Sequence, residues 1–117
     1  MVRRAIEFYR TETGRIPTEE FFDTLSDKVV QKIVAVIELV ETERIVPAKF
    51  FKKLVGTDLY ECRIRWESNI YRLFCFFDRN DKVVITNGFV KKTQKTPQRE
   101  IDKAERYRRD YLARRRV

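Results

Sequence analysis

Three strand-like segments separated by short polar turns constrain the fold of this chain more than any other feature. Residues 59–66 alternate between apolar and charged side chains, residues 70–77 are apolar on both faces except at Arg72, and residues 82–89 form a third apolar segment. Alternation is typical of a half-buried strand, and two apolar faces are typical of a central strand. Because the connecting turns are only a few residues long, we expect these strands to be antiparallel neighbours.

Helices are predicted before and after these strands. Positions 29, 30, 33, 34, 37 and 40 are apolar, which predicts a helix over about residues 27–43 with Ser26 as its N-cap. A short helix capped by Thr18 is expected before it. The last helix is expected over about residues 97–113, with Thr96 as its cap and the following proline at its first position.

The predicted order of elements is β-α-α-β-β-β-α. Residues 2–9 alternate loosely and are interpreted as a first strand, whereas residues 48–57 are interpreted as a basic and aromatic connector. This order predicts an α+β fold in which helices pack on a mostly antiparallel four-stranded sheet. A chain of 117 residues has the length of one domain, so a single domain over residues 1–117 is expected.

Composition excludes several classes of protein. Hydrophobic residues are 43% and charged residues 38%, and no apolar run approaches the roughly 20 residues that span a bilayer. The apolar part of the N-terminus is too short for a secretory signal, so a cytoplasmic protein without a membrane partner is expected. Cys62 and Cys75 are expected to be buried free thiols. Because the chain contains no histidine, a zinc site is disfavoured and no cofactor is expected.

The net charge of +8 is concentrated near the C-terminus. Residues 91–117 hold eleven Lys and Arg against four Asp and Glu, which gives +7 of the total. Such a segment indicates a nucleic acid, an acidic protein or an anionic lipid as partner, or a solvated helix whose charge only aids solubility. We expect the last helix to show its arginines to ribosomal RNA and the fold to survive deletion of residues 114–117. These arginines are Arg106, Arg108, Arg109, Arg114, Arg115 and Arg116.

A second basic group is expected on the sheet. Arg63 and Arg65 share one strand face, and hairpin pairing brings Arg72 close to one of them. Arginines on adjacent strands repel each other unless an anion lies between them, so they predict a phosphate-binding floor. The alternative is that Glu61 and Glu67 neutralise this group and that its role is structural.

Lysines and aromatic residues follow in the adjoining segments. Lys91, Lys92 and Lys95 leave the last strand toward the same region, unless they form only a solvated loop. Tyr71 and Phe89 are candidates for stacking on an unpaired base, with burial in the core as the alternative.

The residues exclude several kinds of catalysis. Without histidine, no His-based acid/base pair operates, and no phosphate-binding glycine loop, nucleophile elbow or carboxylate cluster is present. RNA cleavage by the adjacent 2′-hydroxyl remains possible, because it requires in-line positioning and charge stabilisation that Arg and Lys provide. A lysine whose pKa is lowered by neighbouring cations could serve as the base.

Four motifs resemble those of the RelE/ParE toxin superfamily, and most closely its HigB-like, phage-related branch. They are L-Y-E-C-R-I-R-W, I-Y-R-L-F-C-F-F, V-V-I-T-N-G-F-V-K-K-T-Q-K-T-P and E-I-D-K-A. The resemblance implies the toxin of a type II toxin–antitoxin pair that inhibits translation as a metal-independent, ribosome-dependent mRNA endonuclease. A ParE-like gyrase inhibitor and a non-catalytic RNA- or antitoxin-binding module are the alternatives.

The resemblance also implies site residues and partners. Arg63 and Arg65 match the basic pair of the family, Arg72 matches the arginine of the Tyr-Arg motif, and Lys91 or Lys92 matches the basic residue after the last strand. The catalytic tyrosine and histidine of some members have no counterpart, so the general base stays open. The expected partners are mRNA on the ribosome, ribosomal RNA and a cognate helix-turn-helix antitoxin. The further RNA-binding candidates are Lys52, Lys53, Tyr71, Phe89, Lys95, Arg108 and Arg109.

Overall fold

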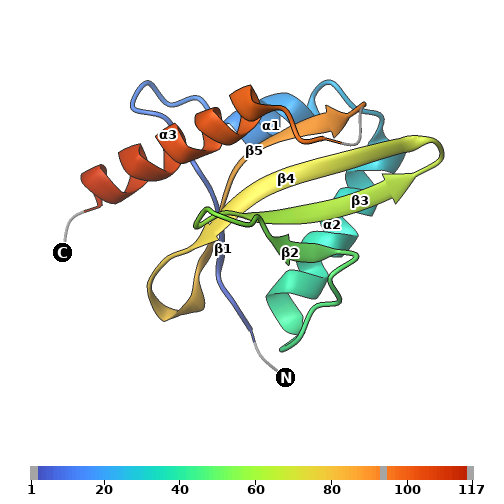
Figure 1. Cartoon of the computed structure of the whole chain (residues 1–117), viewed down its shortest axis with the longest axis horizontal. Coiled ribbons are helices and arrows are strands. Elements are labelled where there is room, and N and C mark those ends of the chain that lie inside the picture. The colour runs from blue at the N-terminus through green and yellow to red at the C-terminus, as the bar shows by residue number, and fades with distance from the viewer. Residues whose placement is uncertain (1–2, 93–94, 116–117) are drawn as a thin grey trace.

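The computed structural model describes residues 3–92 and 95–115, which form one five-stranded sheet with helices on both faces (Figure 1). The elements are β1 (Ile6–Phe8), α1 (Pro17–Phe22), α2 (Asp27–Thr42), β2 (Phe51–Lys53), β3 (Tyr60–Trp66), β4 (Asn69–Phe77), the 3-10 turn η1 (Arg79–Asp81), β5 (Val83–Lys91) and α3 (Gln98–Arg114). The strand order is β1-β5-β4-β3-β2, and only the β1–β5 pair is parallel. The predicted α+β class is therefore confirmed.

The prediction of four strands was wrong, because β2 lies inside the segment interpreted as a connector. This strand has only three residues and pairs antiparallel with β3 at the edge of the sheet. Two of its three residues are exposed lysines, so it shows no alternation of apolar side chains. Short, lysine-rich edge strands resist pairing with other chains, and the same features hide them from pattern analysis.

The two faces of the sheet carry two separate cores. Helices α1 and α2 cover one face, where Ile33 and Val40 are fully buried against β3, β4 and β5. Helix α3 covers part of the opposite face, where Ala104 packs on Phe74 and Phe76 (Figure 1). Each fully buried Ile or Val contributes roughly 1.5–3 kcal/mol to folding. Cys62 and Cys75 are buried free thiols, as expected.

The helix starts were predicted with mixed success. Val29 N donates to Ser26 Oγ at 3.3 Å, which confirms the cap of α2. Thr18 does not cap α1, because the helix begins at Pro17 and Thr18 is buried inside it. Thr96 does not cap α3 either, since Pro97 occupies the cap position and the Thr96 hydroxyl donates instead to Glu61 Oε2 at 3.3 Å.

An irregularity in β5 decides which of its side chains face α3. Phe74 pairs with Asn87 and Cys75 pairs with Ile85, so Thr86 is an extra residue in the ladder. Such a bulge reverses the alternation of the strand beyond it. Phe89 and Lys91 therefore lie on the same face of the sheet as Arg72. If β5 alternated regularly from Val84 onward, Val90 and Lys92 would lie on that face instead.

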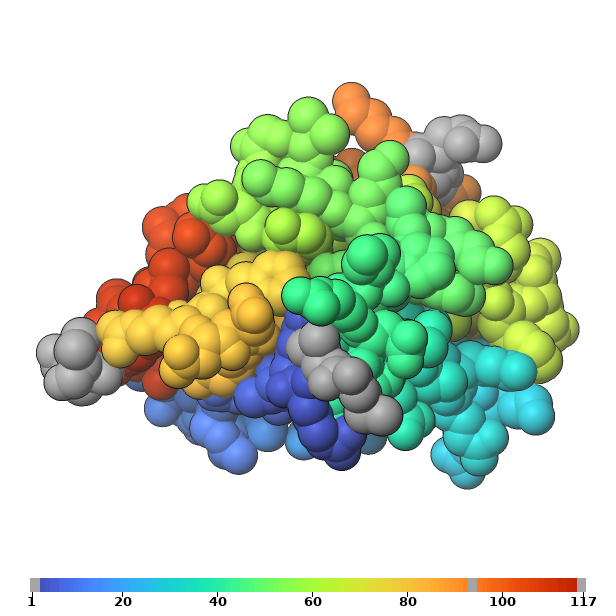
Figure 2. All heavy atoms as spheres, turned by 90° about the horizontal axis from the view of Figure 1, so that it is seen from below, coloured from blue at the N-terminus to red at the C-terminus, as the bar shows by residue number. Residues whose placement is uncertain are grey.

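The end of α3 is held against the start and the far turn of the sheet. Tyr111 Oη donates to Glu7 Oε1 at 3.0 Å, and Arg114 bonds both Asp110 and the carbonyl of Arg10. Arg115 forms an ion pair with Asp78, beside η1, and Figure 2 shows this gold turn next to the red end of α3. Arg114 is nevertheless exposed, as expected, whereas Arg115 is half-buried against Asp78; Arg116 lies outside the described residues.

Candidate functional site

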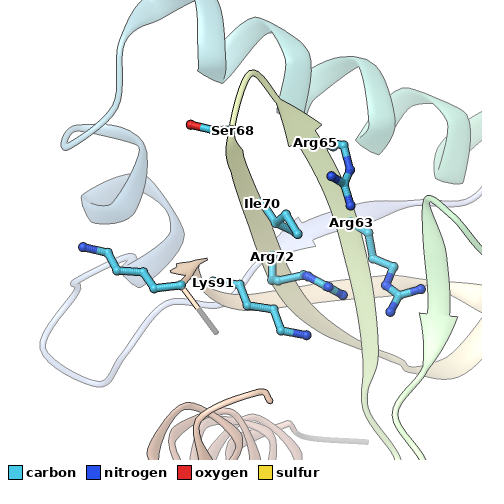
Figure 3. Close-up of a pocket in the computed structure, with 7 residues that line it drawn as sticks. Arg63, Arg65, Ser68, Ile70, Arg72 and Lys91 are labelled. Carbon is cyan, nitrogen blue, oxygen red and sulfur yellow. The ribbon is translucent and has the colours of Figure 1, made fainter. Parts of the chain in front are cut away.

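A hollow of about 580 Å³ lies on the sheet face that α3 leaves open, near the β3–β4 turn (Figure 3). Its lining contains five cations and few other groups. The lining residues are Arg63, Arg65, Ser68, Ile70, Arg72, Lys91 and Lys92. A smaller adjoining hollow of about 240 Å³ shares the three arginines and adds Lys49. All five residues predicted to be catalytic thus lie around one cavity.

Strand pairing explains why the arginines meet. Arg63 of β3 lies directly opposite Arg72 of β4, as the hairpin prediction required. Arg65 lies opposite Ile70, which in turn lies opposite Lys91 of β5. Directly opposed like charges destabilise a sheet, so this arrangement needs a compensating anion.

Glu61 is the anion that the structure itself supplies. It is only 5% exposed, and its Oε1 accepts from Arg72 Nη1 at 2.9 Å and lies 3.7 Å from Arg63 Nε. One buried carboxylate therefore faces two guanidinium groups. Glu67 is exposed and has a backbone φ of 55° in the β3–β4 turn.

The arginines keep unused hydrogen-bonding capacity. Arg72 is 5% exposed, and its Nε finds no hydrogen-bond acceptor among residues 3–92 and 95–115. The same holds for Arg63 Nε in this part of the chain, although Nη1 of Arg63 donates to the carbonyl of Ala48 at 3.3 Å. Burial, opposed mainly by Glu61 and reinforced by Arg63, lowers the pKa of Arg72, yet an arginine stays charged. A buried donor without an acceptor calls for an explanation, and in a hollow lined by cations a bound anion is one.

The pKa of Lys91 is also lowered by its surroundings in the hollow. Burial and the Arg72 guanidinium lower the pKa of Lys91, Arg63 adds to this effect, and the Glu61 carboxylate opposes it. A lysine with a lowered pKa is more often neutral near pH 7 and then accepts a proton. Lys92, the next residue, is exposed at the rim.

The aromatic candidates for base stacking are core residues. Tyr71 is 6% exposed and packs on the side of α1 and α2, whereas Phe89 is 7% exposed and packs with Phe74 at a ring-centroid distance of 5.3 Å. Neither ring offers an open face, so their burial argues against stacking on a base.

The other basic candidates are spread over the molecule. Lys52 and Lys53 are exposed on β2, and neither residue lines either hollow. Lys52 pairs with Glu61 and therefore lies on the same face of the sheet, whereas Lys53 lies on the opposite face. Lys95 is exposed just before Thr96, whose contact with Glu61 keeps this segment near the hollow.

The two arginine candidates of α3 differ in their surroundings. Arg108 forms an ion pair with Asp58 at 3.4 Å and lies over the Phe76 ring, so it packs against the protein. Arg109 is exposed.

Sequence analysis missed two groups at the site and the burial of a third. Lys49 contributes to the smaller hollow, and its place in the basic run before β2 was the available signal. Ser68 lies in the β3–β4 turn and carried no signal. Glu61 was considered only as a neutralising charge, because its alternating position in β3 predicted exposure rather than burial.

This arrangement suits one chemistry. Five cations surround an open cavity, two of them with unused donors, and a lysine with a lowered pKa stands among them. Arginine binds phosphate oxygens through a planar fork, and fixed cations stabilise charge that develops on a phosphate. The hollow is therefore a candidate site for a nucleic-acid phosphate.

The chain belongs to the family described as phage derived protein Gp49-like (DUF891), whose profile matches residues 20–109. This is a family of RelE-like toxins of toxin–antitoxin systems. The matched range contains every residue that lines the hollow. A comparison with curated proteins found no match. The helices in the described part of the chain lack the length and apolar character that crossing a membrane requires.

Proposed function

We propose that this chain is a HigB-like toxin of a type II toxin–antitoxin pair and that it cleaves mRNA on the ribosome in the cytoplasm. One observation carries the proposal: a buried Arg72, whose Nε has no acceptor in the described part of the chain, faces a hollow with four further cations. Most buried polar groups are hydrogen-bonded within the protein, so an unpaired donor in the wall of a cationic hollow supports an external anion as its partner. The family of toxins to which the chain belongs supports a role in growth inhibition.

The proposed reaction is attack by a ribose 2′-oxygen on the adjacent phosphorus. Neutral Lys91 accepts the 2′-hydroxyl proton, the new O–P bond forms, and the bond from phosphorus to the 5′-oxygen breaks. Lys92 adds positive charge at the exposed rim, and the 5′-oxygen takes up a proton from solvent as it leaves. The products are a 2′,3′-cyclic phosphate and a 5′-hydroxyl, so no water is consumed and no electrons are exchanged.

The arginines act on the phosphate rather than on protons. Arg72 and Arg63 lie opposite each other, so together they can bind the non-bridging oxygens on which charge accumulates in the transition state. Arg65 is exposed at the rim and binds a neighbouring phosphate, which fixes the message in register. Removing one preorganised donor of this kind costs on the order of 100- to 1000-fold in rate.

Two macromolecular partners follow from the same site. Ribosomal RNA would meet the exposed arginines of α3, of which Arg109 is one. An antitoxin would inhibit by placing acidic side chains over the five cations, or by preventing access to the ribosome. The whole chain acts as a single domain in this proposal.

The proposal is tested by induced expression in a bacterium, with growth and primer extension as readouts. We compare the wild type with Arg65→Ala, which removes a rim charge, and Lys91→Met, which removes the amine that accepts the proton. Both variants leave the buried Arg72–Glu61 pair in place. The matched control is Arg79→Ala, an exposed arginine in η1. We expect growth arrest and cut transcripts for wild type and control, and loss of both for the two site variants.

Other outcomes assign other functions. Growth arrest with intact transcripts and an induced DNA-damage response would indicate a gyrase inhibitor. Ribosome binding without arrest would indicate a non-catalytic RNA-binding module. Cleavage that persists at wild-type rate in Arg65→Ala and Lys91→Met would show that the hollow is not the active site.

A further inference from the structure

Glu61 makes contacts that simple charge compensation does not require. Its two oxygens are used by two different segments: Oε1 accepts from Arg72 on β4, and Oε2 accepts from the Thr96 hydroxyl in the segment between β5 and α3. Thr96 closely follows Lys91 and Lys92 in the sequence, and these two lysines line the edge of the hollow. The Glu61 carboxylate therefore connects Arg72 in the floor of the hollow with a residue shortly after these lysines.

We propose that Glu61 is a positioning residue for the cleavage reaction, one that orients the Arg72 guanidinium through Oε1 and holds Thr96, just before α3, through Oε2. This inference rests on the proposed function. Glu61 does not line either hollow, so it acts through Arg72 and Thr96 and does not touch the substrate.

The geometry explains why a carboxylate is needed at this position. A guanidinium that binds a phosphate must present its donors in a fixed plane. With Nη1 held by Glu61, the guanidinium of Arg72 is oriented from one side, and its Nε keeps a donor that no described residue accepts. Without this contact the opposed charge of Arg63 would push the guanidinium away from its position.

Glu61 also acts on the charge of Lys91. Two cations that face Lys91, Arg72 and Arg63, lower its pKa, whereas the carboxylate of Glu61 raises it. Lys92 is the neighbouring cation at the rim of the hollow. Removing the negative charge therefore lowers the pKa of Lys91 further, and this shift is measurable without any RNA.

The first experiment compares wild type, Glu61→Gln and Glu67→Gln as purified proteins. Glutamine keeps the shape of Glu61 and removes its charge, and Glu67→Gln is the matched control because it removes an exposed carboxylate from the same hairpin. We measure single-turnover cleavage of ribosome-bound mRNA against pH, and binding of an mRNA with a 2′-deoxy nucleotide at the cut site. Misplacement of a catalytic group by about 1 Å costs about 100-fold in rate, so a loss of about 10- to 100-fold is expected for Glu61→Gln.

The expected pattern separates positioning from general electrostatics. In Glu61→Gln the maximal rate falls, binding of the uncleavable message is equal or tighter, and the midpoint of the pH profile moves to lower pH. The control Glu67→Gln keeps the wild-type rate and midpoint. A folded Glu61→Gln protein that cleaves at the wild-type rate with an unshifted midpoint would overturn the inference.

A second pair of variants covers the case in which Glu61→Gln does not fold. Thr96→Val removes only the contact to Oε2, whereas Thr96→Ser keeps the hydroxyl. We expect a several-fold loss of rate in the first and full activity in the second. Equal activity of both would contradict the role of Oε2 in holding Thr96.

An NMR titration separates this inference from the proposed function. The Cε resonance of Lys91 reports its pKa, and the Nε–H resonance of Arg72 reports whether its guanidinium is held. If the wild type cuts no message, the proposed function fails, and these two signals still test Glu61. A lower Lys91 pKa and a broadened Arg72 signal in Glu61→Gln would support the inference, and unchanged signals would refute it.

Discussion

Gly88 lies on the sheet beneath Phe21 of α1, and replacing it with alanine tests this packing. Gly88 pairs with Leu73 in the middle of the sheet and faces α1. A Cβ added there would lie 2.4 Å from Phe21 Cδ2, 2.6 Å from Phe21 Cε2 and 2.7 Å from Leu73 Cδ2. Carbon atoms prefer about 3.5–4.0 Å, so the Phe21 ring would have to move by roughly 1 Å.

The expected cost of Gly88→Ala is steric rather than conformational. Gly88 is not among the residues with positive φ in the described ranges, so its backbone suits alanine. Overpacking costs about 1–3 kcal/mol, which the better strand propensity of alanine offsets by roughly 0.5–1 kcal/mol. We therefore expect a net loss of about 1–2 kcal/mol in the free energy of unfolding. An unfolding entropy of about 2.1 cal/mol/K per residue converts this to a fall in Tm of about 4–8 °C.

The assay is thermal unfolding followed by circular dichroism, combined with a double-mutant cycle. Phe21→Ala removes the ring that the new methyl group would meet, so Gly88→Ala should cost less in that background. We expect a coupling of about 1 kcal/mol. Additive effects of the two substitutions, or a Gly88→Ala protein as stable as the wild type, would refute this account of the packing.

Three further outcomes are expected. Arg72→Ala should lower the free energy of unfolding by about 3 kcal/mol, because it deprives the buried Glu61 carboxylate of its nearest cation. Exposed Arg65→Ala should change this free energy by less than about 0.5 kcal/mol; urea unfolding compares the two variants, and equal costs would contradict the assignment. Burial and the hydrogen bond to Asp110 raise the pKa of Tyr9 to about 12. The folded state thus holds the Tyr9 proton more tightly than the unfolded state, in which the pKa of tyrosine is about 10. About 2–3 kcal/mol of stability is therefore present below pH 10 and is lost as the pH rises toward 12. Tyr9→Phe should remove this pH dependence, and an equal fall in stability in both proteins would assign it to another group. Binding of single-stranded RNA should weaken as the salt concentration rises. The logarithm of the association constant should fall against the logarithm of the salt concentration with a slope of up to about 3.5, if all five cations of the hollow contact phosphates. An affinity that does not change with salt would exclude phosphate-driven binding.

Local sequence patterns predicted a large part of the fold and of the site. The alternation of residues 59–66 and the doubly apolar segment 70–77 predicted β3 and β4, and the short turn between them implied that Arg72 meets an arginine of β3. The stripe of apolar residues predicted α2 nearly to its ends. These features depend on side chains near one another in the chain, where periods of 2 and 3.6 residues leave a direct trace.

The tertiary structure alone decided the details on which the chemistry depends. The extra residue at Thr86 brings Lys91 onto the face of Arg72, and nothing in the composition of β5 marks that position as a bulge. Burial of Glu61 requires contacts from β4 and from the segment before α3, because a charge leaves water only when partners from elsewhere satisfy it. The face of the sheet on which a side chain lies, and the burial of a charge away from water, are properties of the assembled sheet. They arise only when segments distant in sequence pack together.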